Sequence, residues 1–261
     1  MVAIPQGVFQ MGSDNFYPEE APSREAVVPA FSVDQVPVTN VSFAAFTHQT
    51  GYITKAERDG GSLVFGIHAD RPHACWASVA GASWRHPAGS HTDWQTIPSH
   101  PVVHVSLQDA QAFAQWAGKR LPTEPEWEWA ARGGLCGLDY AWGPNLRVGD
   151  DIPANVWDGE FPYHRRNGLT FPLTSAVASY PANGFGLFDM IGNVWEMTAS
   201  YESDSSSGCC FSEVDGATSR LKPVIKGGSH LCAENYCQRY RPSARQFMAS
   251  PTSHIGFRCV M

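Results

Sequence analysis

Glycine and proline interrupt this chain so often that long regular elements are excluded over most of its length. Its 261 residues include 24 glycines and 19 prolines. Proline breaks helices and central strands, and glycine favours turns and unusual backbone angles. Nine tryptophans supply large apolar side chains that can build a core where regular packing is scarce. We therefore expect a loop-rich α+β fold with low regular secondary structure, two main helices and short antiparallel strands.

The charge of the chain is mildly negative, which argues against nucleic-acid binding. The formal net charge is −7 and the sequence pI is near 5.8, whereas phosphate-binding surfaces normally carry basic clusters. No apolar run approaches the ~20 residues that span a bilayer. The N-terminus lacks the charged and apolar regions of a signal peptide. We expect a cytoplasmic monomer with no nucleic-acid and no membrane partner.

The order of capping and turn residues indicates how the chain is organised. No repeat or linker divides it, so we expect a single domain over residues 1–261. Alternating apolar and polar residues predict short strands over 1–38. Capping residues predict a helix over about 39–50 and two more that follow Ser106 and Thr123. At both of those positions an acidic residue three places later completes a capping box.

Three other stretches are harder to assign. Residues 52–100 show little periodicity and predict a long surface excursion, and the serine-rich stretch 203–212 predicts a mobile loop. The charged segment 118–129 could be catalytic, but a capped helix with surface ion pairs explains its charges as well.

Two of the seven cysteines form a pattern that suggests chemistry. Cys232 and Cys237 have four residues between them and follow the glycine pair at 227–228. Such a pair could form a disulfide, bind a soft metal or supply a nucleophile. Zinc normally needs four ligands, whereas two thiolates suit Cu(I). The spacing alone leaves both metal or redox use and inert structural thiols open. It assigns no role to Cys136, Cys209 and Cys210.

A second segment, 183–196, combines carboxylates with a glycine-rich turn. Asp189 and Glu196 flank this turn, whose carbonyl groups could point inward. Mixed carboxylate and carbonyl oxygens suit Ca²⁺, which takes six to eight oxygen ligands. The alternative is a turn and a strand that pack Trp195 into the core, and the residues alone leave both interpretations open.

At these residues the chain resembles the formylglycine-generating enzyme family, also called sulfatase-modifying factors. The Gly-Gly-Ser-x-x-Cys-x-x-x-Tyr-Cys pattern at 227–237 is the most specific match. Further matches run nearly end to end, over 4–12, 84–87, 100–106, 116–124, 154–157, 192–196 and 256–259. The resemblance implies a fold related to C-type lectins. It also implies an enzyme that uses O₂ and Cu(I) to oxidise the cysteine of a Cys-x-Pro-x-Arg segment in unfolded sulfatases.

The resemblance also assigns roles to individual residues of the copper site. Cys232 and Cys237 match the copper ligands of the family. Ser229 and Tyr236 match polar residues of its site, and Trp195 matches a wall of its pocket. These roles are expectations that follow from the resemblance alone.

The same resemblance implies calcium binding. Residues Asp189, Gly192, Val194 and Glu196 match one family Ca²⁺ site. Asn155 and Val156 match the start of a second site. The acidic residue expected later in that second site is missing. Leu169 takes its place, near Arg165 and Arg166, so we expect this site to be weak or empty because the Coulomb attraction is lower.

Other departures from the family pattern concern histidines and disulfides. His254 stands where the family usually carries an asparagine that lines the site, and His230 replaces a common aromatic residue. An imidazole could bind copper or carry a proton, but drift within a polar pocket explains both changes as well. Cys259 has Ala114 at its usual partner position, which fits a cytoplasmic enzyme.

Two other functions stay open at this point. A non-catalytic binding protein could share the fold, although such relatives typically lack the cysteine pair. A copper oxidase of the same fold could also act on a substrate other than a sulfatase, because the residues around His254 differ from the family pattern.

Overall fold

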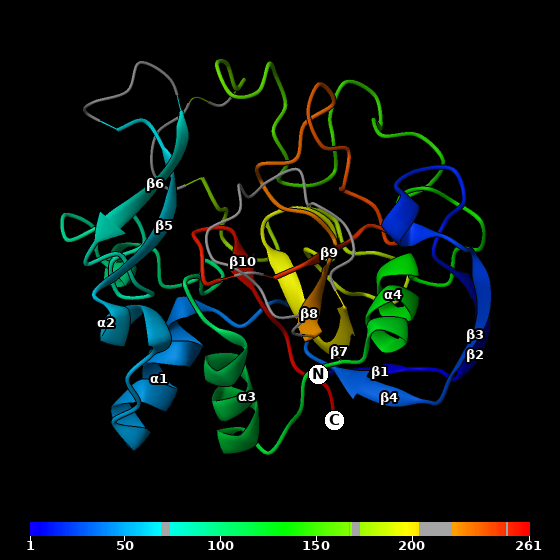
Figure 1. The fold of residues 1–261 in the computed structure, drawn as a ribbon. Coiled ribbons are helices and arrows are strands. Elements are labelled where there is room, and N and C mark those ends of the chain that lie inside the picture. Colours follow the sequence, from blue (N-terminus) through cyan, green and yellow to red (C-terminus); the bar gives the residue numbers. More distant parts are fainter. Residues whose placement is uncertain (69–73, 167, 169–172, 204–220, 249) are drawn as a thin grey trace.

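A four-stranded sheet lies at the centre of the fold (Figure 1). Its order is β10-β7-β8-β9, with β10 parallel to β7 and the other neighbours antiparallel. The computed structural model describes residues 1–68, 74–166, 168, 173–203, 221–248 and 250–261. The strands of this sheet are β7 (Trp195–Ser203), β8 (Leu221–Lys226), β9 (Arg245–Phe247) and β10 (Ile255–Gly256).

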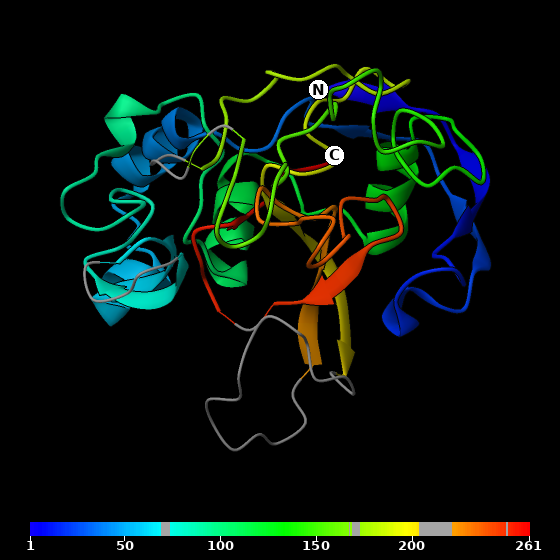
Figure 2. The same ribbon diagram turned by 90° about the horizontal axis from the view of Figure 1, so that it is seen from above.

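Three two-stranded antiparallel sheets surround the central one. They pair β1 (Val2–Ile4) with β4 (Phe31–Val33), β2 (Gly7–Met11) with β3 (Arg24–Val28), and β5 (Gly61–Gly66) with β6 (Cys75–Ala80). The short strands predicted near the N-terminus are therefore confirmed. Ser32 of β4, the strand that pairs with β1, exchanges two backbone hydrogen bonds with Met261, and the two chain ends lie near each other (Figure 2).

Three helices begin directly after the capping residues that the sequence indicates: α1 (Asn40–Thr50), α3 (Leu107–Trp116) and α4 (Glu124–Arg132). The sequence did not predict helix α2 (Lys55–Asp59) or the 3-10 turns η1 (Pro18–Glu20) and η2 (Trp94–Thr96). The Ser106 and Thr123 side chains each accept from the backbone three residues on, and both predicted capping boxes are complete. Among the described residues, no helix is both long and apolar enough to cross a membrane.

The expectation of an irregular surface excursion over 52–100 was wrong. This stretch contains α2, the β5–β6 hairpin and η2, and it buries Phe65 and Trp84. The hairpin strands have six residues each and show no clean alternation of burial, so periodicity could not reveal them. Most of the predicted loop 203–212 lies outside the described residues.

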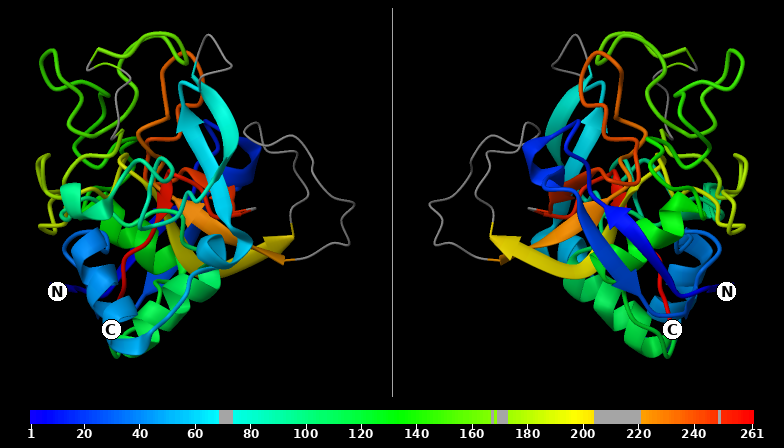
Figure 3. Two further views of the ribbon diagram at one scale, coloured as in Figure 1. Left: turned by 90° about the vertical axis from the view of Figure 1, so that its left-hand side faces the viewer. Right: turned by 90° about the vertical axis from the view of Figure 1, so that its right-hand side faces the viewer.

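One hydrophobic cluster draws on the chain from Ile4 to Val260, and it includes both cysteines of interest. Helix α4 packs against β7 and β8. The described loops between α4 and β7, together with the loop over 227–244, gather at the end of the sheet where β8 ends and β7 begins (Figures 1 and 3). This gathering of loops positions the candidate site.

Candidate functional site

The glycine pair after β8 folds the chain back sharply. Gly227 and Gly228 have φ angles of +89° and +74°, which side chains other than glycine rarely adopt. A Cβ atom would lie 2.6 Å from the Met190 carbonyl oxygen at the first position and 2.3 Å from the Arg239 carbonyl oxygen at the second. Both positions therefore require glycine. Because the Gly228 backbone lies close to the Arg239 backbone, segment 227–237 forms a closed loop.

This loop brings the two predicted copper ligands together. The Cys232 and Cys237 sulfur atoms are 3.4 Å apart, well beyond the ~2.05 Å of a disulfide bond. Ser229 supports the turn, because its carbonyl oxygen accepts from the Cys232 amide at 3.0 Å and its hydroxyl accepts from the Leu231 amide at 3.2 Å. The two cysteines are only 1% and 4% exposed.

Two adjacent buried sulfurs fit Cu(I), a soft ion that thiolates select. In the described part of the chain, no group of three or more His, Cys, Asp or Glu side chains gathers as a metal cage. A four-ligand zinc site thus has no support there. Cys209 and Cys210, whose roles the sequence left open, lie outside the described residues.

The other predicted site residues lie at different depths. Tyr236 is 40% exposed, and its ring stacks on Phe161 with centroids 4.4 Å apart. Trp195 is buried, and its backbone amide donates to the His254 carbonyl oxygen. The His254 ring is also buried, with Nδ1 at 2.6 Å from the Thr252 hydroxyl. Tyr236 therefore offers an accessible surface, whereas Trp195 and His254 form part of the interior.

His230, which lies within the cysteine loop, lines a cavity of about 350 Å³. Its Nδ1 donates to the Asn193 carbonyl oxygen at 2.7 Å. Burial, reinforced by the Arg165 charge, holds the pKa of this imidazole well below 6.5, so it stays neutral. The described lining includes Phe65, His68 and Ser253 but neither cysteine. The cavity thus reaches the histidine wall and not the sulfurs.

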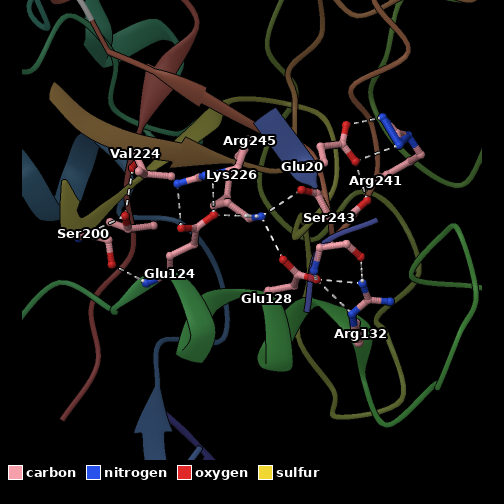
Figure 4. Close-up of polar contacts among 12 residues, drawn as sticks. Glu20, Glu124, Glu128, Arg132, Ser200, Val224, Lys226, Arg241, Ser243 and Arg245 are labelled. Carbon is pink, nitrogen blue, oxygen red and sulfur yellow. Dashed lines mark hydrogen bonds and ion pairs between the residues drawn. The ribbon is translucent and has the colours of Figure 1, made fainter. Parts of the chain in front are cut away.

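Buried ion pairs anchor both ends of the cysteine loop (Figure 4). Before it, Lys226 is fully buried and donates to Glu128 at 2.9 Å and to the Ser243 carbonyl oxygen at 3.0 Å. After it, Arg241 pairs with Glu20 at 2.6 Å. Burial alone would raise the pKa of the Glu128 carboxyl, but Lys226 and Arg132 outweigh it and the pKa is lowered.

This network corrects the sequence interpretation of segment 118–129. We expected surface ion pairs there, but Glu124 and Glu128 are 4% and 0% exposed and face β8. The segment contains the start of the capped helix α4, as the capping pattern predicted. Its Glu124 and Glu128 carboxylates lie inside the protein, because Lys226, far along the chain, pairs with both, whereas Arg120 is half exposed.

The first predicted calcium segment has one carboxylate that fits a cation and one that is already paired. Burial raises the pKa of Asp189, so its negative charge is incompletely compensated. Glu196 accepts two hydrogen bonds from Arg258 and one from the Trp127 indole, all at 2.7 Å. Positive φ angles at Asp189, Gly192 and Asn193 wind this loop tightly.

The second predicted calcium segment contains a protein cation instead. Arg165 is only 9% exposed, and its guanidinium donates to the Asn155 side-chain oxygen and to the Val156 carbonyl oxygen. The residues named by the resemblance therefore do not fit a second calcium ion, because an arginine takes their oxygens. Leu169 lies outside the described residues.

Comparison with known proteins identifies the family. The model of the sulfatase-modifying factor enzyme 1-like domain matches residues 1–261. The chain is 46% identical to the formylglycine-generating enzyme of Mycobacterium tuberculosis, over 100% of this chain and 97% of the relative. It is 36% identical to the inactive C-alpha-formylglycine-generating enzyme 2 of Bos taurus, over 99% of this chain and 87% of the relative.

The solved structure of PvdO from Pseudomonas aeruginosa has the same fold, with a TM-score of 0.64 and 26% identity. The superposition covers 99% of this chain and 92% of PvdO. The predicted α+β fold class is thus confirmed. From the full-length match and the identities above, the chain belongs to the formylglycine-generating enzyme family of sulfatase-modifying factors.

Proposed function

We propose that this protein converts the cysteine of a Cys-x-Pro-x-Arg segment in unfolded sulfatases to Cα-formylglycine, with O₂ as oxidant and Cu(I) as cofactor. The observation that carries the proposal is the 3.4 Å distance between the Cys232 and Cys237 sulfur atoms in the cysteine loop. The conversion itself is supported by relatives named formylglycine-generating enzyme that are 41–46% identical over nearly the whole chain.

Different residues of the cysteine loop would bind the metal and the substrate. Cys232 and Cys237 would hold Cu(I), which supplies the redox chemistry with O₂ when bound. Their burial keeps water away from the two metal-binding sulfurs, which limits side reactions. Tyr236, stacked on Phe161 at the surface, offers an aromatic platform against which an extended substrate segment can lie.

Supporting roles complete the proposal. Asp189, with the carbonyl oxygens of Gly192 and Val194, would hold one Ca²⁺, and Glu196 would add to the field of that site while it pairs with Arg258. The protein would act as a monomer in the cytoplasm, where reducing conditions keep its thiols available.

Mass spectrometry of a substrate peptide tests the function directly. A Cys-x-Pro-x-Arg peptide is incubated with the protein, copper, a thiol reductant and air. We expect the mass change that replaces CH₂–SH by an aldehyde, together with capture of the product by hydroxylamine. The conversion should disappear in Cys232→Ser and in Cys237→Ser, because each variant removes one of two sulfur donors.

The matched control is Cys136→Ser, which changes an exposed cysteine far along the chain from the loop. It should convert the peptide at the parent rate. Turnover that persists in Cys232→Ser would refute the thiolate assignment. If neither the parent nor the control converts the peptide but both bind Cu(I), a different substrate would replace the sulfatase segment.

A further inference from the structure

Arg165 occupies an unusual position for a charged side chain. It is 9% exposed, and its guanidinium lies 5.9 Å from the centre of the Trp157 ring. It donates to the Asn155 Oδ1 atom at 2.5 Å, to the Val156 carbonyl oxygen at 3.3 Å and to the Leu173 carbonyl oxygen at 3.4 Å. All three partners are neutral amide oxygens that converge on one cation.

No carboxylate pairs with this guanidinium among the described residues, whereas its sequence neighbour Arg166 lies 3.2 Å from Asp158. A buried charge is costly unless hydrogen bonds or an opposite charge compensate it. Converging carbonyl and amide oxygens compensate cations in general, and they are the ligands that proteins offer to Ca²⁺. Arginine fits such a cluster because its guanidinium keeps its proton and spreads its charge over several donors.

We infer that Arg165 is a tethered cation that permanently occupies the oxygen cluster of Asn155, Val156 and Leu173, so that this cluster binds no Ca²⁺. The inference concerns structure and ion binding and does not depend on the proposed oxidase function. A covalently attached cation needs no calcium in the surroundings. The stability of this oxygen cluster should therefore not change when a chelator is added, whereas a cluster that holds a free metal ion would lose that ion.

The cluster also connects to the cysteine loop. The Asn155 amide donates to the Asn193 side-chain oxygen at 3.3 Å, and the Asn193 carbonyl oxygen accepts from the backbone and ring of His230. One residue after Val156, the Trp157 amide donates to the Cys232 carbonyl oxygen at 2.9 Å. Arg165 is thus a positioning residue: it holds Asn155 and Val156, and these residues connect to the cysteine loop through Asn193 and Trp157.

Calcium-dependent melting tests the inference in an Asp189→Ala background, where the first calcium segment cannot respond. In that background we expect the same Tm in chelator and in Ca²⁺. Adding Arg165→Glu places a carboxylate among the amide oxygens and should create a calcium response, a rise in Tm of roughly 3–5 °C on adding Ca²⁺. Adding Arg166→Glu, which changes an exposed arginine, should create none.

Two conservative variants separate charge from shape. Arg165→Lys keeps a cation and should retain more of the parent Tm than Arg165→Met, which keeps only an apolar stem. Equal losses in both would overturn the inference. So would a calcium response in the Asp189→Ala protein that vanishes on Asn155→Ala. These melting curves are independent of peptide oxidation, so failure of the proposed function would leave their outcome unchanged.

Discussion

The two sides of the cysteine loop are held by different kinds of contact. On the α4 side, Lys226 and Arg241 meet Glu128 and Glu20, and each buried charge faces an opposite one (Figure 4). On the other side, Asn193 and its neighbours hold the loop through amide and carbonyl groups. We call these the ionic side and the amide side.

The cysteine loop is fixed on its ionic side and lies next to a cavity on its amide side. On the ionic side, removal of one partner leaves an uncompensated charge in the interior, so the arrangement has few alternatives. On the amide side the groups that hold the loop are neutral apart from Arg165 and, at its start, the Asp189 carboxylate, and His230 lines the cavity. The ionic side therefore fixes where the sulfurs lie, and the amide side is where small changes are tolerated.

The largest expected effect comes from breaking the ionic side. Lys226→Met removes the donor to Glu128 and to the Ser243 carbonyl oxygen. We expect the free energy of unfolding to fall by about 3–5 kcal/mol, because a buried carboxylate and a buried carbonyl lose their partner. Urea denaturation followed by tryptophan fluorescence measures this loss.

The control for this prediction is Lys55→Met, which breaks the half-exposed pair with Asp59. Solvent screens such a pair, so its loss should change the free energy of unfolding by less than about 1 kcal/mol. Similar losses in the two lysine variants would mean that the ionic side is no more rigid than the surface, and the comparison would fail.

The sequence predicted what is local and missed what joins distant residues. Helices α1, α3 and α4 could be predicted because capping depends on residues three positions apart. The cysteine loop could be predicted because glycine and cysteine stand within one short pattern.

Glu20 and Arg241 are separated by 221 residues, and Lys226 and Glu128 by 98. No spacing rule connects residues so far apart, because their contact depends on the completed fold. The contact of Arg165 with Asn155 is shorter in sequence, but it depends on the path of an irregular loop that carries no period. The resemblance pointed to those oxygens and not to the cation that binds them.

A smaller effect is expected from calcium at the start of the amide side. Asp189 begins the loop that carries Asn193, and its buried carboxylate accepts from the Ala178 amide at 2.7 Å. The parent should melt at a higher temperature in Ca²⁺ than in chelator. Calcium should raise its free energy of unfolding by about 1–3 kcal/mol when the ion is in ten- to a hundredfold excess over its Kd.

In Asp189→Ala this calcium dependence should vanish, and in calcium the variant should melt below the parent. Glu25→Ala, which removes an exposed carboxylate, should keep the parent response. A parent that melts identically in chelator and in calcium would remove the ion from this segment and leave the amide side without any free cation.

The smallest expected effect is the part of the pH dependence of stability that His230 contributes on the amide side. Burial, then the Arg165 charge, holds the pKa of folded His230 below its ordinary 6.5. Below about pH 6.5, His230 therefore binds a proton in the unfolded chain but stays neutral in the folded chain. The contribution to stability is complete above that pH and is lost as the pH falls, by up to about 1.4 kcal/mol per pH unit.

His230→Asn isolates this contribution, because an amide nitrogen can still donate to the Asn193 carbonyl oxygen but does not titrate. Urea denaturation between about pH 6.5 and about pH 5 should show a shallower loss of stability in this variant than in the parent. Buried His104, with a pKa lowered to about 4 by burial, should keep part of the slope in both proteins. His91→Asn, at an exposed position, should leave the parent slope unchanged. Parallel slopes in His230→Asn and the parent would mean that water reaches His230 from the cavity, and the amide side would then be open rather than closed.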